Sequence, residues 1–180
     1  MPAHPTLPAR RPGRVTTALL GAALALGLPG CSLVGGDRAP PGTAVVVEVV
    51  DGDTVQLRLG RRTESARLLG IDTPETVKPG APVDCYGPEA SARTKALLPA
   101  GTTVRVTRDV EGRDRFDRLL VYVVRARDGL FVNLSLIEDG YARTLSIAPN
   151  DAHRSELAAA AARARAAGRG LWGQCPPEGD

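Results

Sequence analysis

Alternating apolar and polar positions begin at Thr43 and predict β-strands. The alternating apolar residues are Val45, Val47 and Val49 in a first run and Val55, Leu57 and Leu59 in a second. Asp51-Gly52 separates the two runs, and period-two runs on either side of an Asp-Gly pair indicate a β-hairpin. A third strand, Ser65 to Ile71, follows the turn at Gly60-Arg61-Arg62. We therefore expect the domain to open with a meander of three antiparallel strands.

Three helices and two further strands follow the meander. We expect helices over Gly87 to Leu98, Asn133 to Asp139 and Asp151 to Ala167, and strands over Thr103 to Arg108 and Leu119 to Arg125. Pro88 at the first helical position and Glu89 in the first turn favour the start of the first helix. The order βββαββαα is typical of a five-stranded β-barrel of the OB type with helices packed against it.

The first thirty residues have the pattern of an export signal. Arg10, Arg11 and Arg14 precede an apolar run from Val15 to Leu28. A helix of that length reaches about 21 Å, less than the roughly 30 Å of a bilayer core, so a spanning helix is the weaker interpretation. A charged segment before a short apolar segment is typical of a secretory signal. We expect residues 1–30 to be a signal peptide.

The end of the apolar run resembles a bacterial lipobox. It reads Leu28-Pro29-Gly30-Cys31, and in a lipobox the cysteine is lipidated and becomes the first mature residue. Pro29 departs from the usual small residue, and a plain secretory signal is the alternative. Residues 31–43 are rich in glycine and proline without periodicity, which is typical of a flexible tether. We expect a lipoprotein on the outer face of the bacterial cytoplasmic membrane, or otherwise a secreted protein.

The positive charge of the chain belongs to this signal. The chain has 23 Lys and Arg against 20 Asp and Glu, a formal net charge of +3. Removing Arg10, Arg11 and Arg14 leaves 20 basic and 20 acidic residues from Cys31 onward. A neutral domain has no global field that attracts a polyanion, so any such attraction must be local.

Two cysteines follow Cys31. Export favours a disulfide between Cys85 and Cys175, and two separate thiols are the alternative. No cysteine pair has the CxxC spacing of a zinc site, and His4 and His153 are far apart in the sequence. We therefore expect neither a catalytic histidine nor a His/Cys metal site.

Carboxylates and arginines lie at the ends of the predicted strands. Asp53 in the first hairpin and Asp72 after the third strand can converge, and two carboxylates with carbonyls and water suit a hard cation, Ca²⁺ before Mg²⁺. Glu75 can act as a general base toward an attacking water. Arg67 and Arg118 can fork onto phosphate oxygens. Each feature alone is common in turns and on surfaces, but together they describe metal-assisted phosphodiester hydrolysis.

The same stretches resemble the staphylococcal nuclease family. They are DGDTV (51–55), RLLGIDTPE (67–75), YGPEAS (86–91), DRFDRLLVYV (114–123) and GLW (170–172). They occur in the family's order and cover about 43–175. The resemblance implies an OB-fold nuclease domain over residues 44–175 with a short tail, 176–180.

The resemblance also implies roles for individual residues. Asp53 and Asp72 would hold Ca²⁺ through their carboxylates, and the Thr73 carbonyl would complete the protein ligands. Glu75 would activate or orient the attacking water. The arginines that would bind the scissile phosphate are Arg67 and Arg118. Family products carry 3′-phosphates and come from DNA or RNA.

Two departures from the family pattern concern the substrate. Phe116 and Asp117 stand where the family has Tyr and Gly, which removes a hydroxyl that could bind phosphate and places a negative charge beside Arg118. The segment 141–149 begins with Tyr141. It lacks the tyrosines that pack against the nucleotide base in the type enzyme. Base stacking contributes about 1 to 3 kcal/mol per base, so we expect an altered base preference.

The arginines that can supply local attraction for nucleic acid are Arg67, Arg118, Arg113 and Arg115. We expect a monomeric, exported, Ca²⁺-dependent nuclease. The alternative is a non-catalytic OB-fold module that binds nucleic acid or a protein partner. The complete set of polar site residues favours the enzyme, because a binding module has no need for Glu75 beside a pair of metal-binding carboxylates.

Overall fold

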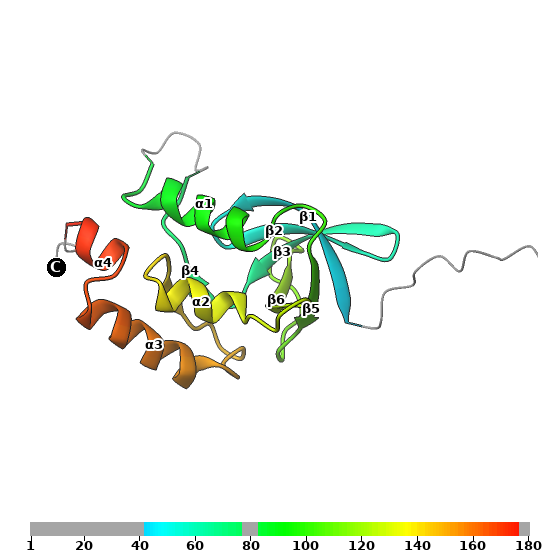
Figure 1. The fold of residues 1–180 in the computed structure, drawn as a ribbon. Coiled ribbons are helices and arrows are strands. Elements are labelled where there is room, and N and C mark those ends of the chain that lie inside the picture. The colour runs from blue at the N-terminus through cyan, green and yellow to red at the C-terminus, as the bar shows by residue number, and fades with distance from the viewer. Residues whose placement is uncertain (1–41, 77–82, 177–180) are drawn as a thin grey trace, which may run out of the picture. The chain divides into compact units, whose positions relative to one another are not determined.

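The computed structural model describes residues 42–76 and 83–176, and its centre is a closed β-barrel (Figure 1). In order around the barrel, the strands are β1 (Thr43–Asp51), β2 (Thr54–Leu59), β3 (Arg62–Leu68), β6 (Leu119–Arg125) and β5 (Thr103–Thr107). β3 and β6 are parallel, and the other neighbours are antiparallel. Closure pairs both sides of each of these strands. The predicted five-stranded barrel of the OB type is confirmed.

The third strand ends earlier than predicted. β3 stops at Leu68, and a separate strand, β4 (Gly70–Asp72), pairs with β7 (Arg143–Leu145) in a two-stranded sheet. Gly70 has φ +77°, a left-handed conformation that glycine adopts without steric cost. The chain therefore turns out of the barrel at Gly70 and carries Asp72 onto the second sheet. β7 was not predicted, because three residues show no periodicity.

A buried asparagine stabilises this break in the strand. The Asn133 side chain donates a hydrogen bond to the Leu69 carbonyl (2.9 Å) and accepts one from the Val123 backbone N–H (2.9 Å). Asn133 itself is completely buried. Its amide thus connects the irregular backbone beside Gly70 to β6, which leaves these buried backbone groups hydrogen-bonded.

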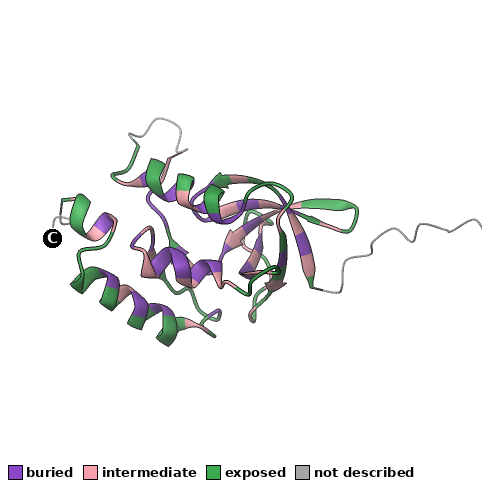
Figure 2. Ribbon diagram, in the orientation of Figure 1, coloured by how far each residue is buried: buried purple, intermediate pink, exposed green. Residues whose placement is uncertain are grey.

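The inward face of β1 differs from the alternation in the sequence. Ala44 and Val46 are buried in the barrel, whereas Val47 is exposed. Register irregularities after Val46 and after Val49 change which side chains face inward, and Asp51 is buried at the end of the strand. Figure 2 shows the buried residues concentrated in the barrel and on the helix faces that meet it. The alternation predicted the strand correctly, but a bulge cannot be recognised from alternation alone.

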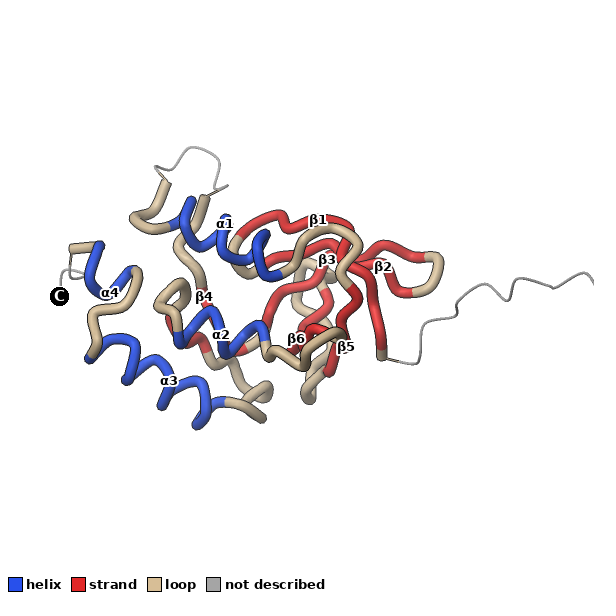
Figure 3. Tube along the Cα trace, viewed as in Figure 1, coloured by secondary structure: helices blue, strands red, loops and turns tan. Residues whose placement is uncertain are grey.

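Helices cover one side of the barrel. They are α1 (Gly87–Leu97), α2 (Val132–Glu138), α3 (Arg154–Ala166) and the short α4 (Leu171–Gln174). Figure 3 shows α1, α2 and α3 side by side, and α2 contacts both of its neighbours as well as β6. Leu136 and Ile137 of α2 are completely buried. The three predicted helices are confirmed within a few residues at their ends, and α4 is an addition.

Several sequence predictions concern residues outside the described ranges. These are the signal peptide 1–30, the lipidation of Cys31, the tether up to residue 41 and the tail from residue 177 onward. Among residues 42–76 and 83–176, no helix combines the length and the apolar character needed to cross a bilayer.

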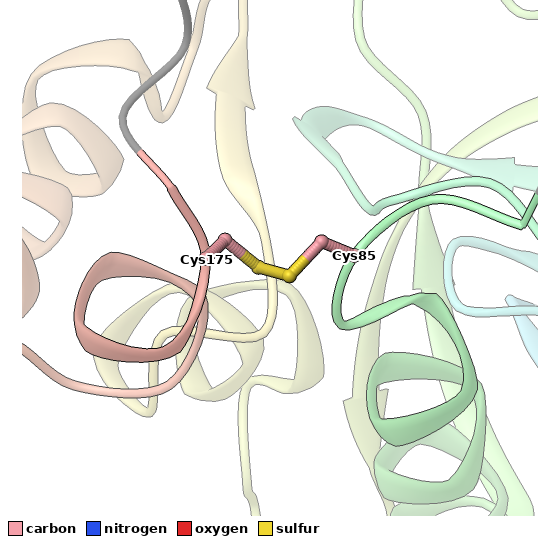
Figure 4. The surroundings of a disulfide bond; sticks show 2 residues. All are labelled: Cys85 and Cys175. Atoms are coloured by element: carbon pink, nitrogen blue, oxygen red, sulfur yellow. A yellow bond between two sulfur atoms is a disulfide. The ribbon is translucent and has the colours of Figure 1, made fainter.

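The predicted disulfide is present in the structure. Cys85 and Cys175 are 90 residues apart in the sequence, and their Cα atoms are 5.9 Å apart (Figure 4). The bond connects the segment before α1 to the residue that follows α4. It thereby closes nearly the whole helical part of the domain into one loop.

Removing this bond is expected to destabilise the fold. In the chain-entropy model, a closed loop of this length stabilises by about 4 to 5 kcal/mol, less any strain. We expect a Cys85→Ser/Cys175→Ser variant to unfold at a lower urea concentration, with its free energy of unfolding reduced by about 2 to 5 kcal/mol. The parent in dithiothreitol should match the variant. A variant as stable as the oxidised parent would contradict the prediction.

Tyr122 is buried where β6 meets the start of α3. Its hydroxyl donates to Asp109 Oδ2 (3.2 Å), and its ring lies 4.4 Å from the ring of His153 and 6.1 Å from that of Phe131, between centroids. Burial, followed by the hydrogen bond to Asp109, raises the pKa of Tyr122 to about 12. The folded protein therefore holds this phenolic proton more tightly than the unfolded chain, whose tyrosines have a pKa near 10.0.

This pKa predicts a pH-dependent stability above pH 10. Stabilisation from the neutral phenol is complete below about pH 10 and is lost as the pH rises toward 12. Tyrosinate absorbance at alkaline pH should show one phenol that titrates near pH 12, and this phenol should be missing in Tyr122→Phe. Between pH 8 and 11, the parent should lose more of its free energy of unfolding than that variant. Titration of every phenol near pH 10 in the folded protein would contradict this assignment.

Candidate active site

Two turns that are distant in sequence meet at one end of the barrel. One is the β1–β2 turn, and the other begins at Thr73, directly after β4. A Cβ atom at Gly52 would lie only 2.5 to 2.8 Å from three side-chain atoms of Thr73. The Thr94 hydroxyl of α1 also donates to the Gly52 carbonyl (2.6 Å). Glycine is therefore required at this position, because any side chain would push the two turns apart.

Asp53 holds the two turns together. Its Oδ2 atom accepts hydrogen bonds from the backbone N–H and from the hydroxyl of Thr73, both at 3.0 Å. Its Oδ1 atom accepts from the Thr54 hydroxyl (3.1 Å). Asp53 is only 7% exposed and also forms an ion pair with Arg67. A buried carboxylate needs such partners, so these contacts fix its position.

Arg67 connects Asp53 with Asp72. Its Nη1 atom faces Asp53 and its Nη2 atom lies 2.8 Å from Asp72 Oδ1. Burial is the largest cause of a lowered pKa of Arg67; the charge of Asp72 opposes this shift, and the positive charge of Arg118 adds to it. The structure thus brings Asp53, Asp72 and Arg67 together, with Arg118 close enough to act on the same guanidinium.

The two carboxylates have the donor chemistry of a hard-cation site. Asp53 and Asp72 converge on one positive group, Arg67, and oxygen donors suit Ca²⁺ or Mg²⁺. Over residues 42–76 and 83–176, no cluster of three or more His, Cys, Asp or Glu side chains has a metal-binding arrangement. The predicted site requires only two carboxylates together with a carbonyl, and the residues present fit it. The role of the Thr73 carbonyl stays a prediction.

Asp51 is a site residue that the sequence analysis did not select. Its carboxylate is buried and accepts hydrogen bonds from the Thr76 hydroxyl (2.6 Å) and from the Gly52 backbone N–H (2.8 Å). Burial acts to raise the pKa of Asp51, but hydrogen bonding with Glu75, Thr76 and Gly52 outweighs it and lowers that pKa. Asp51 therefore connects the loop that carries Glu75 to the barrel. In the sequence it is indistinguishable from an ordinary Asp-Gly turn residue.

A second acid fixes the backbone of Glu75. The Glu75 N–H donates to Asp84 Oδ2 and the Glu75 carbonyl accepts from the Asp84 N–H, both at 3.0 Å. Asp84 directly precedes Cys85, so the disulfide-bonded segment before α1 also anchors the Glu75 loop. Glu75 is thus held beside Asp51. In the sequence it follows Thr73, the residue that contacts Asp53, by two positions.

A tight turn before β6 orients Arg118. Asp114 Oδ1 accepts from the N–H groups of Phe116 and Arg118, both at 2.9 Å, and Asp114 Oδ2 accepts from Arg118 Nε at 2.7 Å. Burial acts to raise the pKa of Asp114, but the hydrogen bonds from Arg118 and Phe116 lower it overall. The ion-pair partner of Arg118 is thus Asp114 and not the adjacent Asp117. Asp117, with φ +63°, pairs with Arg113 at 3.4 Å instead.

The two predicted substrate-binding arginines have different surroundings. Arg113 pairs with Glu64 through both terminal nitrogens, each at 3.0 Å, and also donates to the Asp117 carbonyl (2.6 Å). Arg115 is exposed, and its guanidinium lies 4.7 Å from the centroid of the Phe116 ring. Of the two, Arg115 is therefore the more available to a phosphate, and the substrate role of both stays a prediction.

The segment after α2 offers aliphatic side chains beside the site. β7 pairs with β4 so that Arg143 stands opposite Asp72. Leu145 and Ile147 are 38% and 64% exposed, whereas Tyr141 stacks on Tyr86 at 5.4 Å between ring centroids. The large apolar side chains that residues 143–148 expose are thus aliphatic and not aromatic.

Comparisons with known proteins agree with this arrangement. Residues 65–174 match the protein family described as staphylococcal nuclease homologue. The thermonuclease of Staphylococcus intermedius is 39% identical over 128 residues, which cover 71% of this chain and 74% of the relative. The thermonuclease of Staphylococcus hyicus is 35% identical over 130 residues, covering 72% and 75%. Endonuclease YncB of Bacillus subtilis is 38% identical over 94 residues, covering 52% and 44%. The fold, the residues at the end of the barrel and these similarities together show that the chain belongs to the staphylococcal nuclease family.

Proposed function

We propose that this protein is an exported, Ca²⁺-dependent nuclease that hydrolyses phosphodiester bonds of DNA or RNA and leaves 3′-phosphate ends. The observation that carries the proposal is the convergence of Asp53 and Asp72 on Arg67, with Arg118 nearby. Membership of a family whose relatives include thermonucleases and an endonuclease supports the reaction type.

Asp53, Asp72 and the Thr73 carbonyl would hold the cation. Bound there, Ca²⁺ would polarise the scissile phosphate and offset the negative charge that develops during attack. Asp53 is suited to this role because its contacts with Thr73 fix its carboxylate before any ligand arrives. Asp72 is 54% exposed in its side chain, which leaves it accessible from solvent.

The two arginines would bind and orient the phosphate. Asp114 contacts Arg118 through Nε, which fixes the plane of the guanidinium. Planar guanidinium groups match pairs of phosphate oxygens, and two of them stabilise the extra negative charge of a five-coordinate transition state. Arg67 is largely buried between carboxylates, so it enters the reaction already positioned.

Glu75 would accept a proton from the attacking water. Its backbone is fixed by Asp84, and its side chain meets Asp51. As water attacks phosphorus, one proton passes to Glu75 and the bond between phosphorus and the 5′ oxygen breaks. The 5′ oxygen takes up a proton from solvent water and leaves as a hydroxyl, and the phosphate stays on the 3′ side.

Replacing Glu75 tests this chemistry. We expect Glu75→Gln to lower the cleavage rate by about 10² to 10⁴, because the amide cannot accept the proton. Single- and double-stranded DNA and RNA should be incubated with Ca²⁺ or with EGTA, and the product ends analysed. Glu89→Gln, an exposed acid on α1, serves as the matched control and should cleave like the parent. Equal cleavage in EGTA, or a fast Glu75→Gln enzyme, would exclude the mechanism, and binding without cleavage would favour a non-catalytic module.

A substitution at Gly52 tests the geometry without removing any polar group. Gly52→Ala places a Cβ atom 2.5 to 2.8 Å from Thr73, which must move away from Asp53. A displacement of this kind costs on the order of 100-fold in rate. In the control Gly112→Ala, the new Cβ meets the flexible Arg108 side chain at 3.2 Å, so activity should be retained. Full activity in folded Gly52→Ala protein would show that the Thr73 contact does not position the site.

The proposed location at the cell surface is tested at Cys31. We expect the parent protein in membrane fractions with an acylated Cys31, and the Cys31→Ser variant without acyl chains. Mass spectrometry of the N-terminal peptide and fractionation of the culture check both expectations. Unmodified parent protein free in the medium would replace the lipoprotein assignment with a plain secretory signal.

A further inference from the structure

Four exposed arginines lie at the end of the barrel opposite the candidate active site. Arg61 lies in the turn between β2 and β3, Arg62 is the first residue of β3, and Arg58 is three residues before Arg61 on β2. Arg105 is on β5. All four are exposed. Figure 2 colours much of the protruding β2–β3 hairpin as exposed. We name Arg58, Arg61, Arg62 and Arg105 the arginine end.

The strands separate the arginine end from the site. Thr54 at the start of β2 pairs with Arg67 in the candidate site, and Leu59 at the other end pairs with Arg62. Five residue steps at about 3.3 Å each place these two ends about 17 Å apart along the strands. A ligand at the arginine end therefore leaves the Asp53, Asp72 and Arg67 cluster accessible.

The chain enters the domain at the same end. Val45, near the start of β1, pairs with Arg58, and Thr43 pairs with Arg105. In Figure 1 the start of β1 and the β2–β3 hairpin lie on the same side of the barrel. Eleven residues lie between Cys31 and Thr43, a stretch that spans at most about 40 Å when fully extended. The first described strand therefore begins at the arginine end.

Among the described residues, no acid forms an ion pair with these arginines. The sequence contains no Asp or Glu between Asp53 and Glu64, or between Glu89 and Asp109. Arginines nearer the site are different, because Arg113 pairs with Glu64 and Arg118 pairs with Asp114. None of the four arginines of the arginine end forms an ion pair with a described residue. The formally neutral domain therefore carries a locally positive end.

We propose that the arginine end docks the domain on anionic lipid headgroups of the membrane, an inference that rests on the N-terminal membrane attachment proposed above. Exposed guanidinium groups bind phosphate oxygens, and each basic residue near an anionic bilayer strengthens attachment about fivefold. The attraction decays within about 8 Å at physiological ionic strength, so only a projecting turn at the attached end can use it. Docking here turns the candidate active site away from the bilayer, toward substrate in solution.

A nucleic acid is a less favoured occupant of this surface. It would contact the arginine end about 17 Å from the scissile phosphate, beyond the strands of the barrel. Base stacking would also need aromatic side chains, and residues 54–63 and 99–108 contain none. The lipid surface requires only exposed positive charge close to the attachment point.

Arginine footprinting tests the proposal on the full chain. The protein is reconstituted in nanodiscs of phosphatidylcholine alone or with one third phosphatidylglycerol, in EGTA so that nucleic acid is not cleaved. Phenylglyoxal modification of each arginine is followed by peptide mass spectrometry. We expect modification of the arginine end to slow about fivefold or more in the anionic discs and to recover in 0.5 M NaCl. The exposed Arg154 and Arg165 of α3 serve as internal controls and should react equally in both discs.

A variant isolates the contribution of the turn. In Arg58→Gln/Arg61→Gln/Arg62→Gln, protection of Arg105 in anionic discs should be lost. The matched variant Lys95→Gln/Arg154→Gln/Arg165→Gln carries the same change in charge and should retain protection of Arg105. The result does not depend on cleavage of nucleic acid, so a failure of the docking proposal is distinguishable from a failure of the proposed nuclease activity.

Three outcomes would overturn the proposal. The first is equal modification of the arginine end in both discs. The second is equal protection of Arg154, which would indicate adsorption without orientation. The third is protection by added duplex DNA in phosphatidylcholine discs with none from phosphatidylglycerol, which would identify a nucleic-acid surface instead.

Discussion

The buried carboxylate of Asp53 is the constraint on which the rest of the site depends. Burying an ionised carboxylate costs several kcal/mol unless hydrogen bonds and charge compensate it. At this position the backbone and hydroxyl of Thr73, together with Arg67, provide that compensation. The segments around Asp53, Arg67 and Thr73 are thereby held at one point. Because Asp72 adjoins Thr73 and Glu75 follows it by two residues, both acquire their positions from this contact.

The barrel and the helices supply the geometry that this contact needs. The chain leaves the barrel at Gly70, and Asn133 of α2 satisfies the backbone beside the break. Asp84, next to the Cys85 disulfide, holds the Glu75 loop from the side of α1. The break near Gly70 and the Glu75 loop are therefore supported by segments outside the barrel. This division of roles resembles the general pattern in which loops carry the chemistry and a rigid scaffold positions them.

The barrel also separates two kinds of positive charge. Near the site, Arg67, Arg113 and Arg118 are held by carboxylates, which fixes their side chains and reduces their field. At the opposite end, Arg58, Arg61 and Arg62 lack such partners among the described residues and project into solvent. Net charge conceals this difference, since the domain is formally neutral. Paired arginines suit precise orientation of one phosphate, whereas unpaired ones suit a diffuse anionic surface.

The sequence by itself determined the elements of this protein and the identity of its chemical groups. Period-two runs, the Asp-Gly turn and the proline in the first turn of α1 act over a few residues, so the barrel strands and the three main helices were predictable. The resemblance to a known family added the expected roles of Asp53, Arg67, Asp72, Glu75 and Arg118. Only the tertiary structure decided that β3 breaks at Gly70 and that Asp51 and Asp84 support Glu75. It likewise decided that Arg118 pairs with Asp114 and not with the nearer Asp117. The physical reason is that these outcomes depend on burial and on partners that can lie far apart in the sequence. Asp51 and Thr76 are 25 residues apart, and Leu69 and Asn133 are 64 residues apart, so no local pattern contains them.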